Sequence, residues 1–238
     1  MSQDEIVITK LNKLLKSTED FVLATVINTW NSAPKPIGSM LIINNFGEIF
    51  GSVSGGCVEG AVITEAMTAL KTKESKILTF GVSNSDAFQV GLACGGEIKI
   101  LLEPILQSDK NTREKIGVFI EEYFNNNLVI YCINLISFKR SIIKNVEVAL
   151  SGIPMDRLSE RKSFILDDTF LSILYPKLKL VIVGAVHIAQ YLVELANMFE
   201  YQIFVVDPRS TFASKTRFPT ARIFSEWPDV AIGEIKLD

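Results

Sequence analysis

The sequence predicts an α/β protein: a mixed-sheet N-terminal α/β domain followed by a partial Rossmann-like parallel βαβ unit. Two observations lead to this class. Short runs rich in branched aliphatic residues alternate with amphipathic segments over the first 105 residues, which is typical of strands and helices in one domain. From residue 178 onward, an apolar strand, a helix and a second apolar strand follow in direct succession, which implies parallel strands with a right-handed crossover. With 238 residues, the chain has room for about one and a half average domains.

The N-terminal elements follow from the period of their apolar residues. Val7, Leu11 and Leu14 recur at helical spacing and predict an opening helix. Strands are predicted where short apolar runs occur, and two of them flank Asn45-Phe46-Gly47, which indicates a hairpin. The predicted ranges are strands at 21–27, 39–45, 48–54, 76–82 and 97–105, a helix within 55–73, and a long loop at 83–96.

The second half of the chain begins with another amphipathic helix, marked by Ile116, Phe119 and Ile120, and a buried strand at 128–134. The stretch 137–170 alternates weakly and predicts short strands and a connector. Beyond it come the strand from 178, a helix, a strand at 201–209 and a third strand at 221–224. We therefore expect three parts: an N-terminal domain at 1–110, a connecting helix and strands at 111–176, and a partial Rossmann-like domain at 177–238.

Composition excludes several classes of function. The net charge of −3 offers no basic surplus for nucleic acid, and one histidine is too few for an HExxH zinc site. The most apolar stretch, 178–196, carries four polar or charged residues, so we expect no membrane span. The acidic N-terminus is unlike a signal peptide and predicts a cytoplasmic protein. In that compartment Cys57, Cys94 and Cys132 are expected to be thiols.

The strongest local motif is GSVSGGCVEG at 51–60, where a strand enters a helix through two glycines. Glycines let the backbone turn sharply and approach a ligand, and N–H groups at a helix start form an anion site. The alternative is a tight turn with no ligand. The candidate binding residues of this motif are Ser52, Ser54, Gly55, Gly56, Cys57 and Glu59.

A second motif, GLACGG at 91–96, places Cys94 against Gly95 and Gly96. The two cysteine–glycine turns could converge on one ligand. Cys57 and Cys94 are candidates for binding a soft metal or for attacking a sulfur or carbon centre, and the alternative is that each is buried and inert. Cys132 lies among apolar residues, so the buried reading is favoured there.

A third motif is the proline-stiffened loop SAPKPIGS at 32–39, in which Lys35 offers a positive charge to a phosphate. The alternative is a solvated surface lysine.

The fourth motif, GAVHIA at 184–189, has the spacing of the dinucleotide fingerprint G-x-G-x-x-G/A. Val186 stands where the second glycine lets the backbone reach the pyrophosphate, so the pattern disfavours NAD(P). Asp207 lies 23 residues after Gly184, near the position of the ribose-binding acid. His187 is either a ligand or acid–base group or a plain helix-start residue.

Together these motifs resemble the XdhC/CoxI family, the accessory proteins for xanthine dehydrogenase and related molybdenum hydroxylases. The resemblance rests on TWNSAPKPIGS (29–39), GSVSGGCVEG (51–60), GLACGG with the strand after it (91–104), GAVHIAQ (184–190) and VVDPRSTFASKTRFP (205–219).

The resemblance implies a non-catalytic chaperone that binds the molybdenum cofactor, protects it during sulfuration and delivers it to the apo form of a molybdenum hydroxylase. The implied partners are that hydroxylase and a cysteine desulfurase. A second copy of the chain is a further expected partner, because the short second domain would need cover. The implied binding set adds Gly184, His187, Asp207 and Arg209 to the residues of the N-terminal motifs. Two departures stand out: Lys35 replaces an arginine, which loses a bidentate phosphate fork, and the chain looks truncated at its C-terminus.

Two alternatives remain open from the sequence. One is a nucleotide-dependent oxidoreductase that uses the Rossmann-like unit. The other is a truncated paralogue with only an interaction role.

Overall fold

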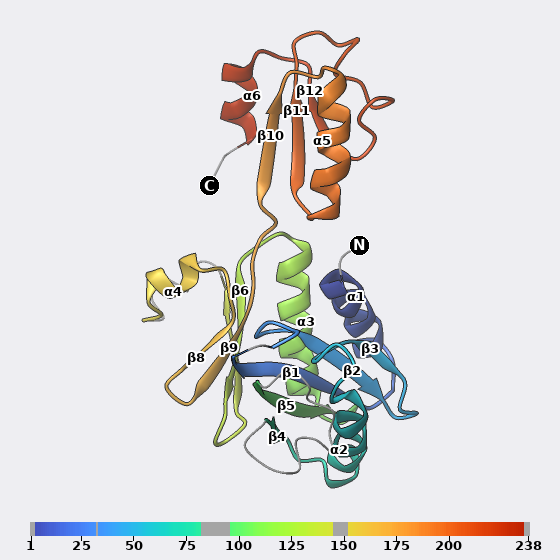
Figure 1. Cartoon of the computed structure of the whole chain (residues 1–238), viewed down its shortest axis with the longest axis vertical. Coiled ribbons are helices and arrows are strands. Elements are labelled where there is room, and N and C mark those ends of the chain that lie inside the picture. Colours follow the sequence, from blue (N-terminus) through green and yellow to red (C-terminus); the bar gives the residue numbers. More distant parts are fainter. Residues whose placement is uncertain (1–2, 32, 82–95, 145–151, 236–238) are drawn as a thin grey trace. The chain divides into compact units, whose positions relative to one another are not determined.

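The computed structural model describes residues 3–31, 33–81, 96–144 and 152–235, which form two compact units, 3–176 and 177–238 (Figure 1). Each unit contains helices packed on a β-sheet, which confirms the predicted α/β class. Within the described ranges, no helix is both long and apolar enough to cross a membrane.

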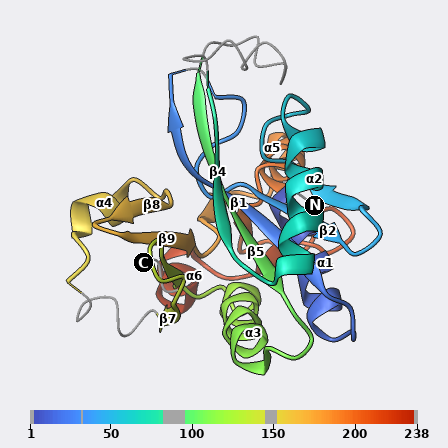
Figure 2. The ribbon, with the colours of Figure 1, turned by 90° about the horizontal axis from the view of Figure 1, so that it is seen from below.

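The first unit is built on a five-stranded antiparallel sheet in the order β3-β2-β1-β5-β4. One face packs against α2, whose Val62 and Ala66 are buried, and Figure 2 shows this helix running beside the strands. The opposite face packs against α1 and α3. The elements are α1 (Gln3–Leu15), β1 (Phe21–Trp30), β2 (Met40–Asn44), β3 (Ile49–Gly51), α2 (Glu59–Thr72), β4 (Lys76–Phe80), β5 (Glu97–Ile105) and α3 (Lys110–Phe124).

A second sheet in the same unit has the order β7-β6-β9-β8 and is antiparallel throughout. One face, with Tyr131 and Phe170, belongs to the same core as α1 and α3, so the predicted connector is packed as part of this unit. The other face, with Cys132 and Leu171, packs against α4. The elements are β6 (Val129–Asn134), β7 (Arg140–Lys144), α4 (Met155–Ser159), β8 (Phe164–Leu166) and β9 (Thr169–Leu174).

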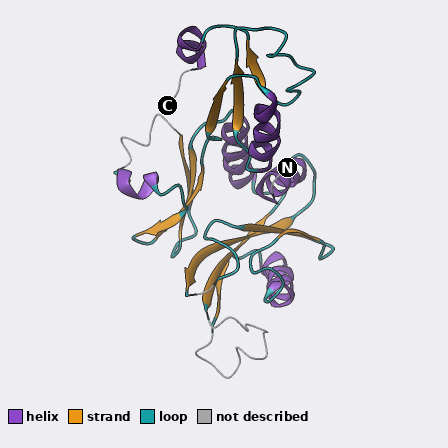
Figure 3. Ribbon diagram, turned by 45° about the horizontal axis from the view of Figure 1, so that its top comes forward, coloured by secondary structure: helices purple, strands orange, loops and turns teal. Residues whose placement is uncertain are grey.

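The second unit is a three-stranded parallel sheet in the order β10-β11-β12, which agrees with the predicted βαβ crossover (Figure 3). The apolar side of α5 packs on one face through Ala189 and Val193. On the other face, α6 packs through Ala231 and Ile235 against Phe204. The elements are β10 (Lys179–Val183), α5 (His187–Met198), β11 (Gln202–Val206), β12 (Arg222–Phe224) and α6 (Pro228–Ile235).

Candidate functional site

The motifs of the first unit emerge at one end of its five-stranded sheet. Trp30, the last residue of β1, pairs with Glu97, the first residue of β5. On the other side, Leu41 at the start of β2 pairs with Gly51 at the end of β3. Because β1 is antiparallel to both β2 and β5, the lysine loop after β1, the glycine turn after β3 and Gly96 just before β5 all lie at this end of the sheet.

The carboxylate of Glu59 fills the glycine turn from inside. Its Oε1 accepts hydrogen bonds from Ser52 Oγ at 2.7 Å, Ser54 N at 2.9 Å and Val53 N at 3.2 Å. Its Oε2 accepts from Gly56 N at 2.9 Å and from the Ser54 hydroxyl. The two serine oxygens in turn accept from the N–H groups of Gly55 and Val58, at 2.9 Å each. The turn is therefore a closed hydrogen-bond network centred on one buried acid.

This network corrects one expectation from the sequence. The backbone N–H groups of Val53, Ser54 and Gly56 are not free for an outside anion, because the Glu59 carboxylate already accepts from them. Burial alone would raise the pKa of Glu59, but the hydroxyls of Ser54 and Ser52 and the backbone N–H groups lower it to about 2. Glu59 is thus ionised at neutral pH, and none of the hydrogen-bond donors described around it is a cationic side chain.

Outside the network, the turn presents an open surface. Gly55, Gly56 and Cys57 are exposed, and a Cβ built on Gly56 would meet nothing within 4 Å. Both glycines have positive φ angles, 74° and 114°, which side-chain-bearing residues rarely adopt. The proline loop lies close by, since a Cβ on Gly55 would come within 3.7 Å of Pro34 Cβ. Lys35, half-buried, belongs to that same loop.

The second cysteine–glycine motif falls largely outside the described residues. Cys94 and Gly95 are not among them, and Gly96 is described as the buried residue just before β5. The pairing of Cys57 with Cys94 therefore stays a prediction. Cys132 is buried in β6, and burial raises the pKa of its thiol to about 11. Among the described residues, no group of three or more His, Cys, Asp or Glu side chains could hold a metal ion.

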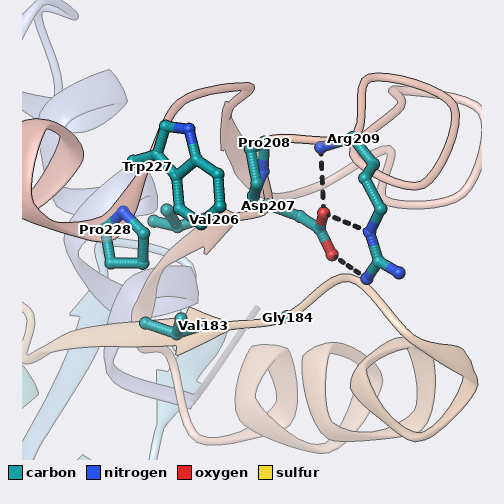
Figure 4. A pocket seen from close by; sticks show the side chains of 8 residues that line it. All are labelled: Val183, Gly184, Val206, Asp207, Pro208, Arg209, Trp227 and Pro228. Carbon is teal, nitrogen blue, oxygen red and sulfur yellow. Dashed lines mark hydrogen bonds and ion pairs between the residues drawn. The ribbon is translucent and has the colours of Figure 1, made fainter.

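In the second unit, a carboxylate again fills a glycine turn. Asp207 follows β11 and is buried, and its Oδ2 accepts from Ala185 N at 2.8 Å. The same oxygen accepts from Arg209 Nη2 at 2.7 Å (Figure 4). Its Oδ1 accepts from Arg209 Nε at 2.9 Å and Arg209 N at 3.0 Å. The Arg209 hydrogen bonds hold the pKa of Asp207 well below its usual range. Gly184, with φ of 105°, lets the chain turn back toward this acid.

Neither His187 nor Val186 is among the hydrogen-bond donors described for this acid. His187 is exposed at the start of α5, with its ring 5.0 Å from that of Tyr191. Val186 is the residue before the helix and is also exposed. Gly184, Asp207 and Arg209 line one pocket, and His187 is not part of its lining.

Sequence reasoning missed a third buried acid. Glu103 in β5 is fully buried and accepts from Arg140 Nε at 2.7 Å and from Tyr131 Oη at 3.2 Å, while its Oε2 has no hydrogen-bond partner. Burial raises the pKa of Glu103 even though Arg140 opposes the shift. The available signal was an acid inside the apolar run EIKILLEPI, but the position of its partner on β7 was not readable from the sequence.

The fold and its turns define a class: a two-unit α/β protein with a glycine–cysteine turn in the first unit and a Rossmann-like second unit. Two family models agree with this class: "XdhC and CoxI family" matches residues 14–81, and "XdhC Rossmann domain" matches residues 180–232. The chain belongs to the XdhC and CoxI family.

Several relatives are similar to this chain. A probable xanthine dehydrogenase component of Bacillus subtilis (strain 168) is 22% identical over 242 residues, which cover 96% of this chain and 72% of that protein. "Molybdenum cofactor insertion chaperone PaoD" of Escherichia coli (strain K12) is 32% identical over 91 residues, 38% of this chain and 28% of that protein. A crystal structure of a xanthine dehydrogenase from Bacillus halodurans superposes with a TM-score of 0.69 at 23% identity, covers all of this chain and 72% of that one, and supports the fold.

Proposed function

We propose that this protein is a maturation factor that binds the molybdenum cofactor and delivers it to a molybdenum hydroxylase of the xanthine dehydrogenase or CO dehydrogenase type. The observation that carries the proposal is the exposed Gly55-Gly56-Cys57 surface, in which the buried Glu59 network holds both glycines at positive φ angles that other residues rarely adopt. Its family and the name of the Escherichia coli relative support the same role.

The residues present fit a pterin phosphate ligand in a specific way. Because Glu59 already accepts the N–H groups of the turn, the counter-charge for a phosphate has to come from Lys35 in the neighbouring loop. The side-chain-free face of Gly56 lets a flat ligand approach the backbone. The Cys57 thiol is exposed beside that face and is the soft group nearest to it in the described sequence.

Each side chain then has a limited task. Glu59 keeps the turn closed, Lys35 holds the phosphate, and Cys57 offers a thiol to the metal side of the ligand. The cofactor, when bound, supplies the molybdenum and dithiolene chemistry that the receiving hydroxylase needs. The partners in this proposal are the apo-hydroxylase and, for sulfuration, a cysteine desulfurase.

The geometry of the second unit argues against the oxidoreductase alternative. The acid that would bind a ribose hydroxyl, Asp207, already accepts four hydrogen bonds from Ala185 and Arg209. Val186 also stands at the position where a pyrophosphate would approach the backbone.

The test is to purify the chain from cells that make molybdopterin and to measure bound pterin by fluorescence after oxidation. We expect bound pterin in the wild type and a loss of about tenfold or more in Cys57→Ala and Gly56→Val. Absence of pterin from the wild type, or unchanged binding in both variants, would contradict the proposal.

A matched control is Gly47→Val. Gly47 also has a positive φ, 81°, and its Cβ would also meet nothing within 4 Å, but it lies in the β2–β3 hairpin at the opposite end of the sheet. Backbone strain is therefore similar in the two variants, and pterin should remain bound to Gly47→Val. Lys35→Ala tests the charge in the same way, with Lys71→Ala on α2 as its control. We expect loss of pterin only in Lys35→Ala.

A further inference from the structure

The second unit contains an open pocket of about 650 Å³ beyond the carboxyl ends of its strands. Val183 ends β10, Val206 ends β11, and Trp227 precedes α6. Figure 4 shows Trp227 and Pro228 on one side and the Asp207–Arg209 pair on the other, with Val183 at the end of β10 and Gly184 directly after it. Ligands of open α/β sheets bind at this edge, and small-molecule sites have volumes of this order.

The apolar walls of this pocket are exposed to solvent. Trp227 is 69% exposed and Val183 is 58% exposed, although both residues are large and apolar. Pro208 and Pro228 add rigid apolar surface. An indole face beside an open pocket is a stacking platform for a flat heterocycle.

The polar wall consists of the Asp207–Arg209 ion pair, which carries no net charge. Its acid is buried and its guanidinium is exposed to solvent. The Asp207 carboxylate already accepts four hydrogen bonds from Ala185 and Arg209, so it does not accept a further one from a ligand hydroxyl. A guanidinium has five N–H donors, and the Asp207 carboxylate takes two of those on Arg209. The Arg209 side chain is 54% exposed, so its outer edge can donate to an anion at the mouth of the pocket.

Size also restricts the ligand. In a dinucleotide fingerprint the second glycine admits the pyrophosphate, and here Val186 carries a branched side chain at that position. The pocket therefore suits one ring and its phosphate rather than two linked nucleotides.

We propose that this pocket binds a flat nitrogen heterocycle that carries a phosphate group, with the ring stacked on Trp227 and the phosphate at the outer edge of Arg209. Two sources share this chemistry, a purine mononucleotide and a pterin phosphate. The inference goes beyond the proposed function, because the pocket lies in the other unit and none of its lining residues belongs to the glycine–cysteine turn.

The chain has two tryptophans, so Trp30→Phe leaves Trp227 as the single fluorescent indole. This protein is titrated with AMP, with adenosine, with inorganic phosphate and with NAD. The pterin monophosphate titration uses Trp30→Phe combined with Gly56→Val, so that the glycine–cysteine turn does not contribute. We expect AMP or the pterin phosphate to quench Trp227, and adenosine, inorganic phosphate and NAD to bind about tenfold or more weakly than AMP.

Calorimetry on full-length Trp227→Ala and Trp227→Phe separates stacking from folding. Trp227 is mostly exposed, so neither variant should unfold the unit. We expect Trp227→Ala to weaken binding by about tenfold or more and Trp227→Phe to retain most of it. Trp30→Ala, whose tryptophan is 67% exposed in the first unit, is the matched control and should bind as the wild type does.

The proposal is overturned if neither AMP nor the pterin phosphate quenches Trp227 at millimolar concentration, if Trp227→Ala binds AMP as tightly as the wild type, or if NAD binds as tightly as AMP. Loss of pterin from Gly56→Val with unchanged AMP affinity would support both sites, so failure of one does not count against the other.

Discussion

Each unit of this protein has a glycine turn whose backbone N–H groups donate to a buried carboxylate, Glu59 in the first unit and Asp207 in the second. The two acids differ in their other hydrogen-bond partners. In the first unit Glu59 accepts only from hydroxyls and backbone N–H groups, and no described donor to it is a cationic side chain. In the second unit Asp207 accepts from one loop N–H and from three groups of Arg209. Both turns are closed by hydrogen bonds, yet the first keeps a net negative charge and the second is neutral.

That difference affects what each turn can bind. An anion approaching the first turn meets a buried carboxylate and needs Lys35 from another loop to offset it. An anion approaching the second turn meets a neutral pair with the cation outermost. The glycine motif alone therefore does not predict an anion site, because the internal acid can take the N–H groups first.

The largest expected effect is on Glu59. We expect Glu59→Ala to lower the free energy of unfolding of the first unit by about 3 kcal/mol, because it leaves several buried donors without an acceptor. Urea unfolding followed by circular dichroism measures this loss. Glu65→Ala on the same helix is the control; its side chain is 43% exposed and ion-paired with Lys76, so its cost should stay within about 0.5 kcal/mol. Equal costs for the two variants would show that the turn does not depend on Glu59.

Asp207→Asn should cost less, about 2 kcal/mol, because the amide oxygen can still accept from Ala185 or Arg209 while the charge attraction is lost. The readout is hydrogen exchange of the amides in β10 and β11, which reports on the second unit alone. Asp229→Asn, an exposed acid in the first turn of α6, is the control and should leave exchange unchanged. A larger loss of stability in Asp207→Asn than in Glu59→Ala would mean that the second turn depends more on its acid than the first turn does, contrary to our expectation.

The pH dependence of stability distinguishes Glu59 from the third buried acid, Glu103. Hydrogen bonds lower the pKa of Glu59 from 4.5 to about 2, so its contribution is complete above pH 4.5 and is lost as pH falls toward 2. The expected loss between pH 4.5 and pH 3 is about 1.5 kcal/mol, absent in Glu59→Gln.

The contribution of Glu103 to stability depends on pH in the opposite direction. Burial raises its pKa above 4.5, so its stabilising contribution is complete below pH 4.5 and is lost as pH rises through the folded-state pKa. Glu103→Gln should remove that decline and leave the acid limb unchanged. Denaturant midpoints of the wild type and both variants from pH 3 to pH 7 test the two signs, and a single common slope would contradict them.

The sequence predicted the strands and the βαβ crossover because these depend on local periodicity. The strand expected at 97–105 is observed as β5 with the same bounds, and the hairpin around Asn45–Gly47 is observed between β2 and β3. The sequence also placed Glu59 in the candidate site, since it lies one turn after the glycines. It did not predict that Glu59 would accept the turn N–H groups, because that depends on a side-chain rotamer.

Contacts between distant residues were beyond sequence reasoning. Glu103 and Arg140 meet across 37 residues. Arg113 donates to the carbonyls of Leu14, Leu15, Ser17 and Glu19, which lie 94 to 99 residues earlier, at and just after the C-terminal end of α1. These contacts depend on how sheets and helices pack, which no local pattern encodes. Arg209 was a candidate ligand residue, and its pairing with Asp207 two residues away appears only in the folded turn.

The smallest expected effect isolates the glycines from the acids. Gly56 and Gly184 have similar φ angles, 114° and 105°, and a Cβ on either would meet nothing within 4 Å. Gly56→Ala and Gly184→Ala should therefore each cost about 1 kcal/mol, from backbone strain alone. If the Glu59 carboxylate holds its turn more strongly than Asp207 holds the other, Gly56→Ala will keep the hydrogen bonds of the first turn. Gly184→Ala will then weaken the hydrogen bonds of the second turn. Exchange of the amide at position 56 in Gly56→Ala and of the Ala185 amide in Gly184→Ala measures this difference, and equal loss of protection at both sites would mean that the two turns are held equally.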